Sequence, residues 1–334
     1  MVTTMEQLAQ PLDVWLDCDP GHDDIVAIMI ASYAENCHLL GVSTVHGNSS
    51  IEHTTHNALA VLELLGIGVP VYRGAPKPLM RENKLATHIH GENGLSNTKL
   101  LPPNPKKSAQ PNAVFNMYKA IMDNPRPVVY VATGPLTNVA LLVSTYPDVT
   151  SNIEKLVFMG GSTGVGNITS QAEFNMYADP EAARLVVEAN SLRGKLYMVP
   201  LDVTHTVLLD RATLQKLREH PSPFAALLVD VMTAFSDTYE KTYGFKEGVP
   251  VHDACAMAAA LWPDMAEFKP MTTSVSLDAL TLGRTVCDVW GQIAEPVNNV
   301  NIVFRMDVPR FWSMILEIVR RIQDRRQSVL EMLV

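Results

Sequence analysis

Four aspartates stand within eight residues near the start of the chain, in the segment 17–24, which reads DCDPGHDD. Capping of a following helix accounts for one or two of these acids, because carboxylates in a first turn are stabilised by free amides and the helix dipole. It does not account for Asp17 and Asp19 at a strand end, where carboxylates this close repel unless a cation lies between them. With Pro20-Gly21 as a tight turn, Asp19 and Asp23 or Asp24 can converge on one hard ion, Ca²⁺ or Mg²⁺.

Further polar blocks follow the apolar runs of the chain. Because ligands bind beyond the carboxyl ends of strands in open parallel sheets, these blocks are where we expect chemistry. They read HGN at 46–48, HGENGL at 90–95, ATGPLTN at 132–138, MGG at 159–161, EFN at 173–175 and VHDA at 251–254, with Asn167 between the fourth and fifth.

The elements that must position these blocks alternate between apolar runs and helical patterns, which predicts an α/β protein with an open, mainly parallel sheet. We predict early strands at 14–18, 39–45, 128–132, 156–159 and 196–199, and helices at 23–34, 136–145 and 180–189. The later part is predicted to hold helices at 223–243 and 253–261, strands at 272–277, 286–290 and 300–304, and a last helix from Pro309.

Composition limits the class of protein. The chain has 334 residues, 47% hydrophobic and 18% charged, so it can bury a large core, and no linker or repeat divides it. We therefore predict one domain over 1–334, with residues 1–12 as a flexible extension. The net charge of −9 disfavours nucleic acid and anionic membranes as partners. No apolar run reaches a membrane span, so we expect a cytoplasmic protein.

Cysteines and two close histidines carry less information. The four cysteines, at 18, 37, 255 and 287, form no paired spacing, so we interpret them as buried reduced thiols; a zinc site built on them is the less favoured alternative. His53 and His56 stand three residues apart on a predicted helix without an acidic partner block. We interpret them as helix surface.

In order and spacing, these blocks from residue 14 to about 260 resemble the inosine-uridine nucleoside hydrolase family, whose amino-terminal signature is similar to DCDPGHDD. The resemblance implies a Rossmann-like fold and cleavage of the bond between ribose and nucleobase. It also implies Ca²⁺ held by Asp19, Asp24, Asp253 and the main-chain carbonyl of Thr133. By the same resemblance Asp19 is the general base that activates the Ca²⁺-bound water, and His252 protonates the departing base.

The resemblance also implies a substrate pocket. Asp23 and Asn175 would bind the 2′-hydroxyl and Asp253 the 3′-hydroxyl. Asn167 and Glu173 would bind the 5′-hydroxyl, with Asn48 and Met159 lining the same space. Phe235, Tyr239 and Tyr243 lie on a predicted helix and could face the base, with a tyrosine as alternative acid; we expect His90 near one of the two tyrosines. His252 and Asn48 favour cleavage of uridine, with inosine also accepted, and the family implies a homodimer or homotetramer.

Two other functions fit part of the pattern. An aspartate-based Mg²⁺ phosphotransferase or phosphatase also carries two aspartates after its first strand, with the first as nucleophile, but has no role for Asp23, Asp24 or the later His252-Asp253 pair. A non-catalytic nucleoside-binding protein would keep the pocket without turnover. The presence of every acid that the hydrolytic chemistry needs argues against such a loss.

Overall fold

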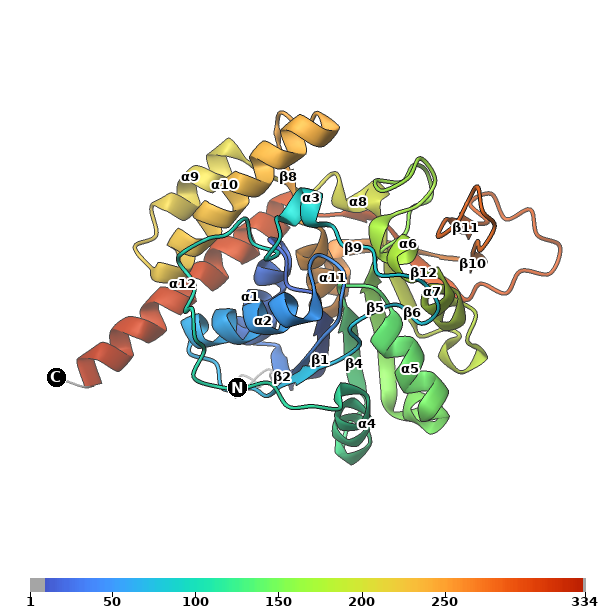
Figure 1. The fold of residues 1–334 in the computed structure, drawn as a ribbon, viewed down its shortest axis with the longest axis horizontal. Coiled ribbons are helices and arrows are strands. Elements are labelled where there is room, and N and C mark those ends of the chain that lie inside the picture. Colours follow the sequence, from blue (N-terminus) through green and yellow to red (C-terminus); the bar gives the residue numbers. More distant parts are fainter. Residues whose placement is uncertain (1–9, 333–334) are drawn as a thin grey trace, which may run out of the picture.

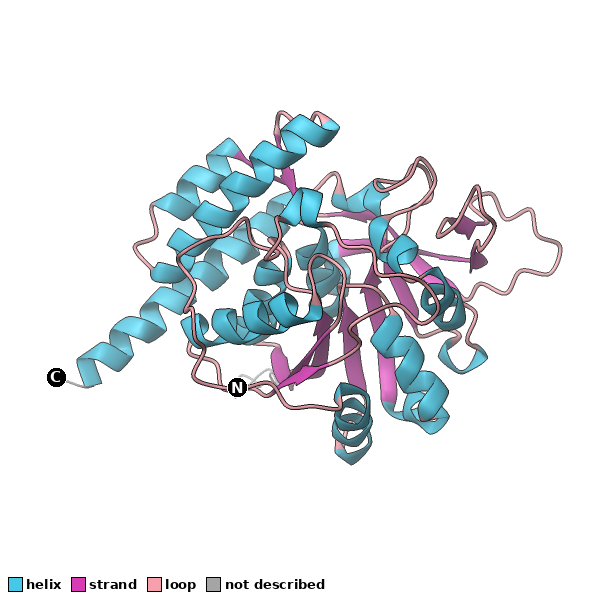
Figure 2. Ribbon diagram, in the orientation of Figure 1, coloured by secondary structure: helices cyan, strands magenta, loops and turns pink. Residues whose placement is uncertain are grey.

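One eight-stranded sheet forms the centre of the molecule (Figures 1 and 2). The computed structural model describes residues 10–332. The strand order is β3-β2-β1-β4-β5-β6-β12-β9, and every neighbouring pair is parallel except β12 and β9. The strands are β1 (Leu12–Cys18), β2 (Cys37–Thr44), β3 (Val71–Arg73), β4 (Val128–Ala132), β5 (Ile153–Met159), β6 (Leu196–Val199), β9 (Ala266–Met271) and β12 (Val300–Met306).

Both faces of this sheet are covered, because side chains alternate along each strand. In β1, Val14 and Leu16 pack into one core and Trp15 into the other. The first core is closed by α1 (Asp24–Tyr33), α2 (Ile51–Leu65), α10 (Pro223–Tyr243), α11 (His252–Leu261) and α12 (Val308–Met332). The second is closed by α4 (Ala113–Asp123), α5 (Thr137–Thr145) and α7 (Pro180–Val187).

Shorter elements connect this framework. They are α3 (Thr87–His90), α6 (Phe174–Ala178), α8 (Leu201–Thr204), α9 (Arg211–Arg218) and the 3-10 helices at Pro147–Asn152, Asn190–Leu192 and Pro263–Met265. Two small antiparallel sheets pair β7 (Leu208–Asp210) with β8 (Gly248–Pro250) and β10 (Thr273–Val275) with β11 (Thr285–Cys287). The small sheet of β10 and β11 projects from the rest of the molecule beside a long loop (Figure 1).

The predicted fold class is confirmed, and the differences are local. The predicted strands at 272–277 and 286–290 form shorter strands that pair with each other instead of joining the main sheet. Residues 1–9 of the predicted extension 1–12 lie outside the described residues. Its last residue, Leu12, already belongs to β1, and the Leu12 amide donates to the carbonyl of Asn36. None of the described helices has the length and apolar character that a membrane crossing requires.

The four cysteines and the two close histidines all lie within the described residues. All four cysteines carry free thiols; Cys18 and Cys255 are buried, and Cys37 and Cys287 are half-buried. On α2, His53 is exposed, as expected for helix surface, whereas His56 is half-buried.

Candidate active site

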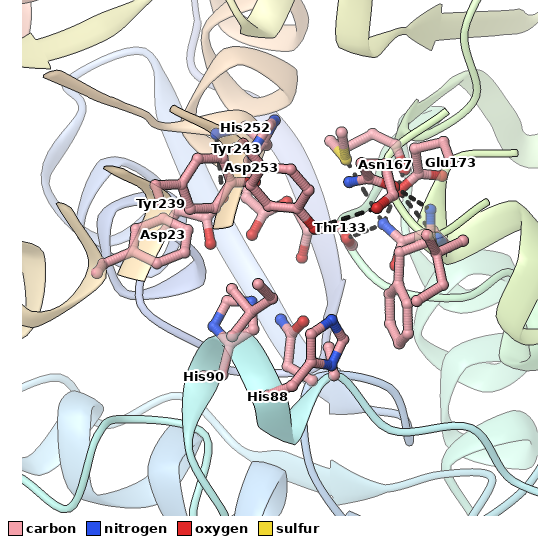
Figure 3. A pocket seen from close by; sticks show the side chains of 18 residues that line it. Asp23, His88, His90, Thr133, Asn167, Glu173, Tyr239, Tyr243, His252 and Asp253 are labelled. Atoms are coloured by element: carbon pink, nitrogen blue, oxygen red, sulfur yellow. Dashed lines mark hydrogen bonds between the residues drawn. The ribbon is translucent and has the colours of Figure 1, made fainter. Parts of the chain in front are cut away.

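The strand order reverses between β1 and β4, and this is the point where open α/β sheets bind ligands. A cavity opens there above the carboxyl ends of the strands (Figure 3). All but two of the sequence-predicted site residues line it; Asp19 and Asp24 lie outside the lining. The lining residues are Asp23, Asn48, Ala86, His88, Ile89, His90, Thr133, Met159, Asn167, Ile168, Glu173, Phe174, Asn175, Phe235, Tyr239, Tyr243, His252 and Asp253.

Three buried aspartates meet at one end of the cavity. Asp23 and Asp24 come from the start of α1 and Asp253 from the first turn of α11, and each offers an oxygen within 4.8 Å of the other two. Burial and repulsion from Asp24 raise the pKa of Asp23 to about 7. Burial, and then repulsion from the neighbouring aspartates, raises the pKa of Asp253 well above its usual value. Within the described residues this is the one group of three acidic, histidine or cysteine side chains close enough to share a metal ion.

Asp24 is held in place by hydrogen bonds from three directions. Thr133 Oγ1 donates to Asp24 Oδ1 at 2.7 Å, and the Gly21 amide and Asn48 Nδ2 donate to Asp24 Oδ2 at 2.9 and 3.0 Å. These donors follow β4, β1 and β2, so three strand ends fix one carboxylate. The predicted block HGN therefore contributes through Asn48, which bridges the first and second loops.

Asp19 lies beside this group. Its Oδ2 accepts from the Asn48 amide at 2.7 Å, whereas its Oδ1 is buried without a partner. Burial and repulsion from Asp24 raise the pKa of Asp19 well above its usual value. Gly47 and Gly134 leave room for this carboxylate, since a Cβ at Gly134 would lie 2.6 Å from Asp19 Oδ1. An unpartnered carboxylate oxygen next to crowded acids is what a hard cation would satisfy, so the donor set fits Ca²⁺ or Mg²⁺.

Asp17 does not belong to the site. It lies inside β1, and its Oδ1 accepts hydrogen bonds from Ser43 Oγ and Asn138 Nδ2 at 2.5 and 2.7 Å. Burial raises the pKa of Asp17 to about 7. Donors from β2 and α5 engage only Oδ1 of Asp17, and its Oδ2 has no partner within the described residues. Asp17 is not among the three acids close enough to share an ion, and relief of its repulsion with Asp19 by a cation stays a prediction.

The opposite end of the cavity is formed by the segment 159–175. Asn175 Nδ2 donates to the carbonyl of Thr133 at 2.8 Å and to that of Met159 at 3.2 Å. Glu173 caps α6, accepting from the amides of Gly161, Asn175 and Met176. Burial raises the pKa of Glu173 to about 7 despite these bonds. Glu173 therefore shapes this wall as well as lining it.

Aromatic and histidine side chains from α3, α10 and α11 form the remaining wall. His252 Nε2 lies 2.7 Å from Tyr239 Oη, and its Nδ1 lies 2.7 Å from Thr204 Oγ1. Burial, and then His205, lowers the pKa of His252 well below its usual value. Tyr243 Oη donates to the carbonyl of Asn167 at 3.1 Å and so joins α10 to the opposite loop. His252 and Tyr239 thus form one hydrogen-bonded pair.

Sequence reasoning missed the supports behind this wall. His22 is fully buried next to His90, and burial lowers the pKa of His22 to about 3. Asn57 Nδ2 donates to the carbonyls of Pro20 and Asn93 and ties the first loop to the segment 91–97. His22 could have been found, because it stands inside the DCDPGHDD block; Asn57 gives no such signal on α2.

Fold and site together define a Rossmann-like α/β protein with a carboxylate-lined ligand pocket at its topological switch point. The family model for inosine-uridine preferring nucleoside hydrolases matches residues 14–313. The chain belongs to this family. The resemblance inferred from the motifs is thereby confirmed.

Two of the relatives with named activities differ in the base that they name. An uncharacterized protein of Schizosaccharomyces pombe is 61% identical over 93% of this chain and 94% of its own length. The pyrimidine-specific ribonucleoside hydrolase RihB of Escherichia coli is 36% identical over 91% of this chain and 96% of its own. The solved purine-preferring ribonucleoside hydrolase from Gardnerella vaginalis superposes with a TM-score of 0.86 at 30% identity, covering 93% of this chain and 99% of that one.

Proposed function

We propose that this nucleoside hydrolase cleaves the N-glycosidic bond of both uridine and inosine to ribose and free base. The observation that carries this proposal is the arrangement of the cavity: buried carboxylates at one end and the hydrogen-bonded pair of His252 and Tyr239 on a wall of the same cavity. Cleavage by this route needs acids that bind the sugar and activate water, and a separate group that assists the departing base.

Asp19, Asp24, Asp253 and the carbonyl of Thr133 would hold Ca²⁺. Ca²⁺ suits this set better than Mg²⁺ because it accepts seven or eight oxygens in flexible geometry, whereas Mg²⁺ demands a small octahedron. When bound, the ion offsets the repulsion between these acids and makes a nearby water more acidic. The unpartnered Oδ1 of Asp19 supports its role as the proton acceptor from that water.

The ribose would lie between the acidic end of the cavity and the wall opposite it, and would contact residues of both. Asp23 and Asn175 face the space in which we place the 2′-hydroxyl, and Asp253 the 3′-hydroxyl. Asn167 and Glu173 would take the 5′-hydroxyl, with Asn48 and Met159 completing the wall. Because Glu173 already accepts three amide hydrogens, it would bind this hydroxyl with a carboxylate that is fixed in direction.

The departing base would lie against Phe235, Tyr239, Tyr243 and His90. Tyr239 can pass a proton toward the base while His252 Nε2 shares a hydrogen bond with its hydroxyl, so the two groups act together. The names of the relatives point both ways, since one is pyrimidine-specific and another purine-preferring. A wall that includes three aromatic side chains of one helix supports a range that includes uridine and inosine.

The phosphotransferase alternative meets a structural obstacle. Its nucleophile would be Asp17, which is fully buried, engaged by Ser43 and Asn138, and absent from the cavity wall.

The proposal includes nucleosides as the ligands, rather than nucleic acid or a membrane surface, and the negative net charge supports this choice. It also includes a cytoplasmic homodimer or homotetramer.

A reducing-sugar assay with Ca²⁺-loaded protein tests the proposed reaction. We expect ribose from uridine and inosine, with kcat/KM measured for cytidine and adenosine alongside. Tight nucleoside binding without ribose would leave a binding protein, and phosphate release from a phosphomonoester without ribose would favour the phosphotransferase. Fast adenosine cleavage with no detectable uridine cleavage would contradict the proposed substrate range.

A further inference from the structure

His22 lies directly behind the wall of the cavity. Its ring is fully buried and packs against those of His90, with ring centroids 5.0 Å apart, and Phe235, with centroids 4.8 Å apart, and these two rings also contact each other. His90 and Phe235 both line the cavity, whereas His22 does not. The His22 ring therefore acts on a ligand through side chains that line the cavity rather than by direct contact.

One backbone hydrogen bond determines where His90 carries its proton. The main-chain amide of His22 donates to His90 Nδ1 at 3.3 Å. A backbone amide always carries hydrogen, so His90 Nδ1 must accept and is unprotonated. His22 Nδ1, which lies 2.9 Å from the same His90 Nδ1, then carries a proton and donates to the one lone pair of that nitrogen, which it shares with the longer bond from the backbone amide. The remaining nitrogen of His90, Nε2, consequently holds the ring proton.

The same reasoning extends to Ser96. His22 Nε2 lies 2.8 Å from Ser96 Oγ. In a neutral His22 ring with its proton on Nδ1, Nε2 accepts the hydrogen of the Ser96 hydroxyl. The order of donors therefore runs from Ser96 through His22 to His90, and each bond fixes the direction of the next.

We propose that His22, supported by Ser96, is a positioning residue that keeps His90 in the Nε2–H form, so that His90 presents a donor to an acceptor atom of the nucleobase. This inference rests on the proposed function. A fixed donor complements a carbonyl oxygen or unprotonated ring nitrogen, and its hydrogen bond strengthens as negative charge develops on the departing base. Nucleobases, which leave poorly without assistance, should depend on it, whereas p-nitrophenolate, a stabilised anion that leaves readily unaided, should not.

Neutron diffraction on deuterated crystals of the full chain tests the proton positions without turnover. We expect deuterium on His90 Nε2 and His22 Nδ1. Deuterium on His90 Nδ1 overturns the proposal, whatever the enzyme hydrolyses. If the wild-type protein released no ribose from any nucleoside, the proposed function would fail, and this map would still decide the tautomer.

Kinetics with two substrates test the consequence. His22→Phe keeps a ring in the stack but removes the donor, whereas His22→Asn can place an amide nitrogen where Nδ1 stood. We expect His22→Phe to lower kcat/KM for uridine about tenfold, the equivalent of one lost hydrogen bond, and to leave p-nitrophenyl riboside within about twofold. His22→Asn should recover most of the uridine activity.

A second pair of variants covers the case in which His22→Phe does not fold. Ser96→Ala removes the hydroxyl that supports His22, and Thr98→Ala removes a hydroxyl from the same segment that binds Asp230 instead. We expect only Ser96→Ala to lower the ratio of uridine to p-nitrophenyl riboside activity. Equal losses on both substrates in His22→Phe and Ser96→Ala would overturn the proposal, because they would show a general effect on the shape of the site.

Discussion

Asp17 and Asp19 are two residues apart, but one has a structural role and the other lies in the candidate site. Asp17 still lies within β1, paired with Ser43 of β2 and Ala132 of β4, and its carboxylate serves as an acceptor for the core. Asp19 follows the end of the strand, where its unpartnered Oδ1 lies close to the other acids of the site; Asp17 also has one unpartnered oxygen, Oδ2, but no such acidic neighbours raise its pKa. An acid inside a parallel strand thus has a structural role, whereas an acid just past the end of the strand is available to bind a ligand.

Substitution of each aspartate should distinguish the catalytic role of Asp19 from the structural role of Asp17. We expect Asp19→Ala to abolish turnover, with a loss of at least about a thousandfold, because it removes both a cation ligand and the proton acceptor. Asp17→Asn keeps an oxygen for Ser43 and Asn138, so kcat/KM should stay within about threefold of wild type. Steady-state assays with uridine, alongside circular dichroism to verify folding, make the comparison. Near-normal turnover by folded Asp19→Ala would contradict the role assigned to it.

The two tyrosines of α10 form a matched pair for the departing base. Tyr239→Phe removes the hydroxyl that bonds His252 Nε2, and we expect kcat for inosine to fall about a hundredfold, as for loss of a general acid. Tyr243→Phe removes only the bond to the Asn167 carbonyl, so KM should rise while kcat changes little. Initial-rate measurements on both variants distinguish the effects. Equal effects on kcat would contradict the pairing of Tyr239 with His252.

The helices and strands that the sequence predicts correctly contain residues that mark where they begin and end. Helix α10 has the predicted ends because Ser222 caps its amino end, Pro223 occupies the first turn, and Gly244 ends it with φ of 78°. The buried strands β1 and β4 were predictable as apolar runs followed by polar blocks. The loops at their carboxyl ends gave most of the candidate site for the same reason.

Elements without such signals were missed. Strand β9 has the sequence AEFKPM, in which a lysine and a proline suit an exposed edge but do not give an apolar run. Helix α4 buries only Ala113, Met117 and Ile121, a stripe one residue wide. The contact of His22 with Ser96 joins segments 74 residues apart, and no local pattern encodes it.

The amino end of β1 provides a prediction on stability away from the site. Asp13 accepts hydrogen bonds from His38, Asn124 and Arg126, which join β1 to β2 and to the loop before β4. Burial alone would raise the pKa of Asp13, but these donors outweigh it and lower the pKa. The lowered pKa means that the stabilisation is present above the unfolded-state pKa and is lost as the pH falls through the folded-state value.

We therefore expect Asp13→Asn to reduce the free energy of unfolding by about 1–3 kcal/mol at pH 7, as for a hydrogen-bonded charge. The difference from wild type should shrink below about pH 4, where the unfolded chain binds the proton. Urea unfolding across this range measures it. Asp123→Asn, which loses only an exposed contact with Lys119, is the control and should change little. A difference that grows as the pH falls would contradict the assignment.

At the scale of the whole molecule, the site joins segments that are far apart in the chain. Asp19 and Asp24 follow β1, Thr133 follows β4, and Asp253 lies in the first turn of α11, which packs against the sheet and α1. Unfolding separates all of these ligands, so an ion bound by them stabilises the folded chain alone. Without the ion, the same crowded acids work against folding, as the raised pKa of Asp253 indicates.

Calorimetry with and without Ca²⁺ tests this coupling. At Ca²⁺ one hundred times above its Kd, the folded state should gain about 2.7 kcal/mol, which raises Tm by several degrees relative to protein in EDTA. Asp253→Ala should lose this rise and, because it relieves repulsion, should unfold in EDTA no earlier than wild type. Asp13→Asn, whose change lies at the far end of β1, should start from a lower Tm and keep the full rise. A wild-type Tm that does not respond to Ca²⁺, or an Asp253→Ala variant that still responds fully, would show that these carboxylates do not form the cation site.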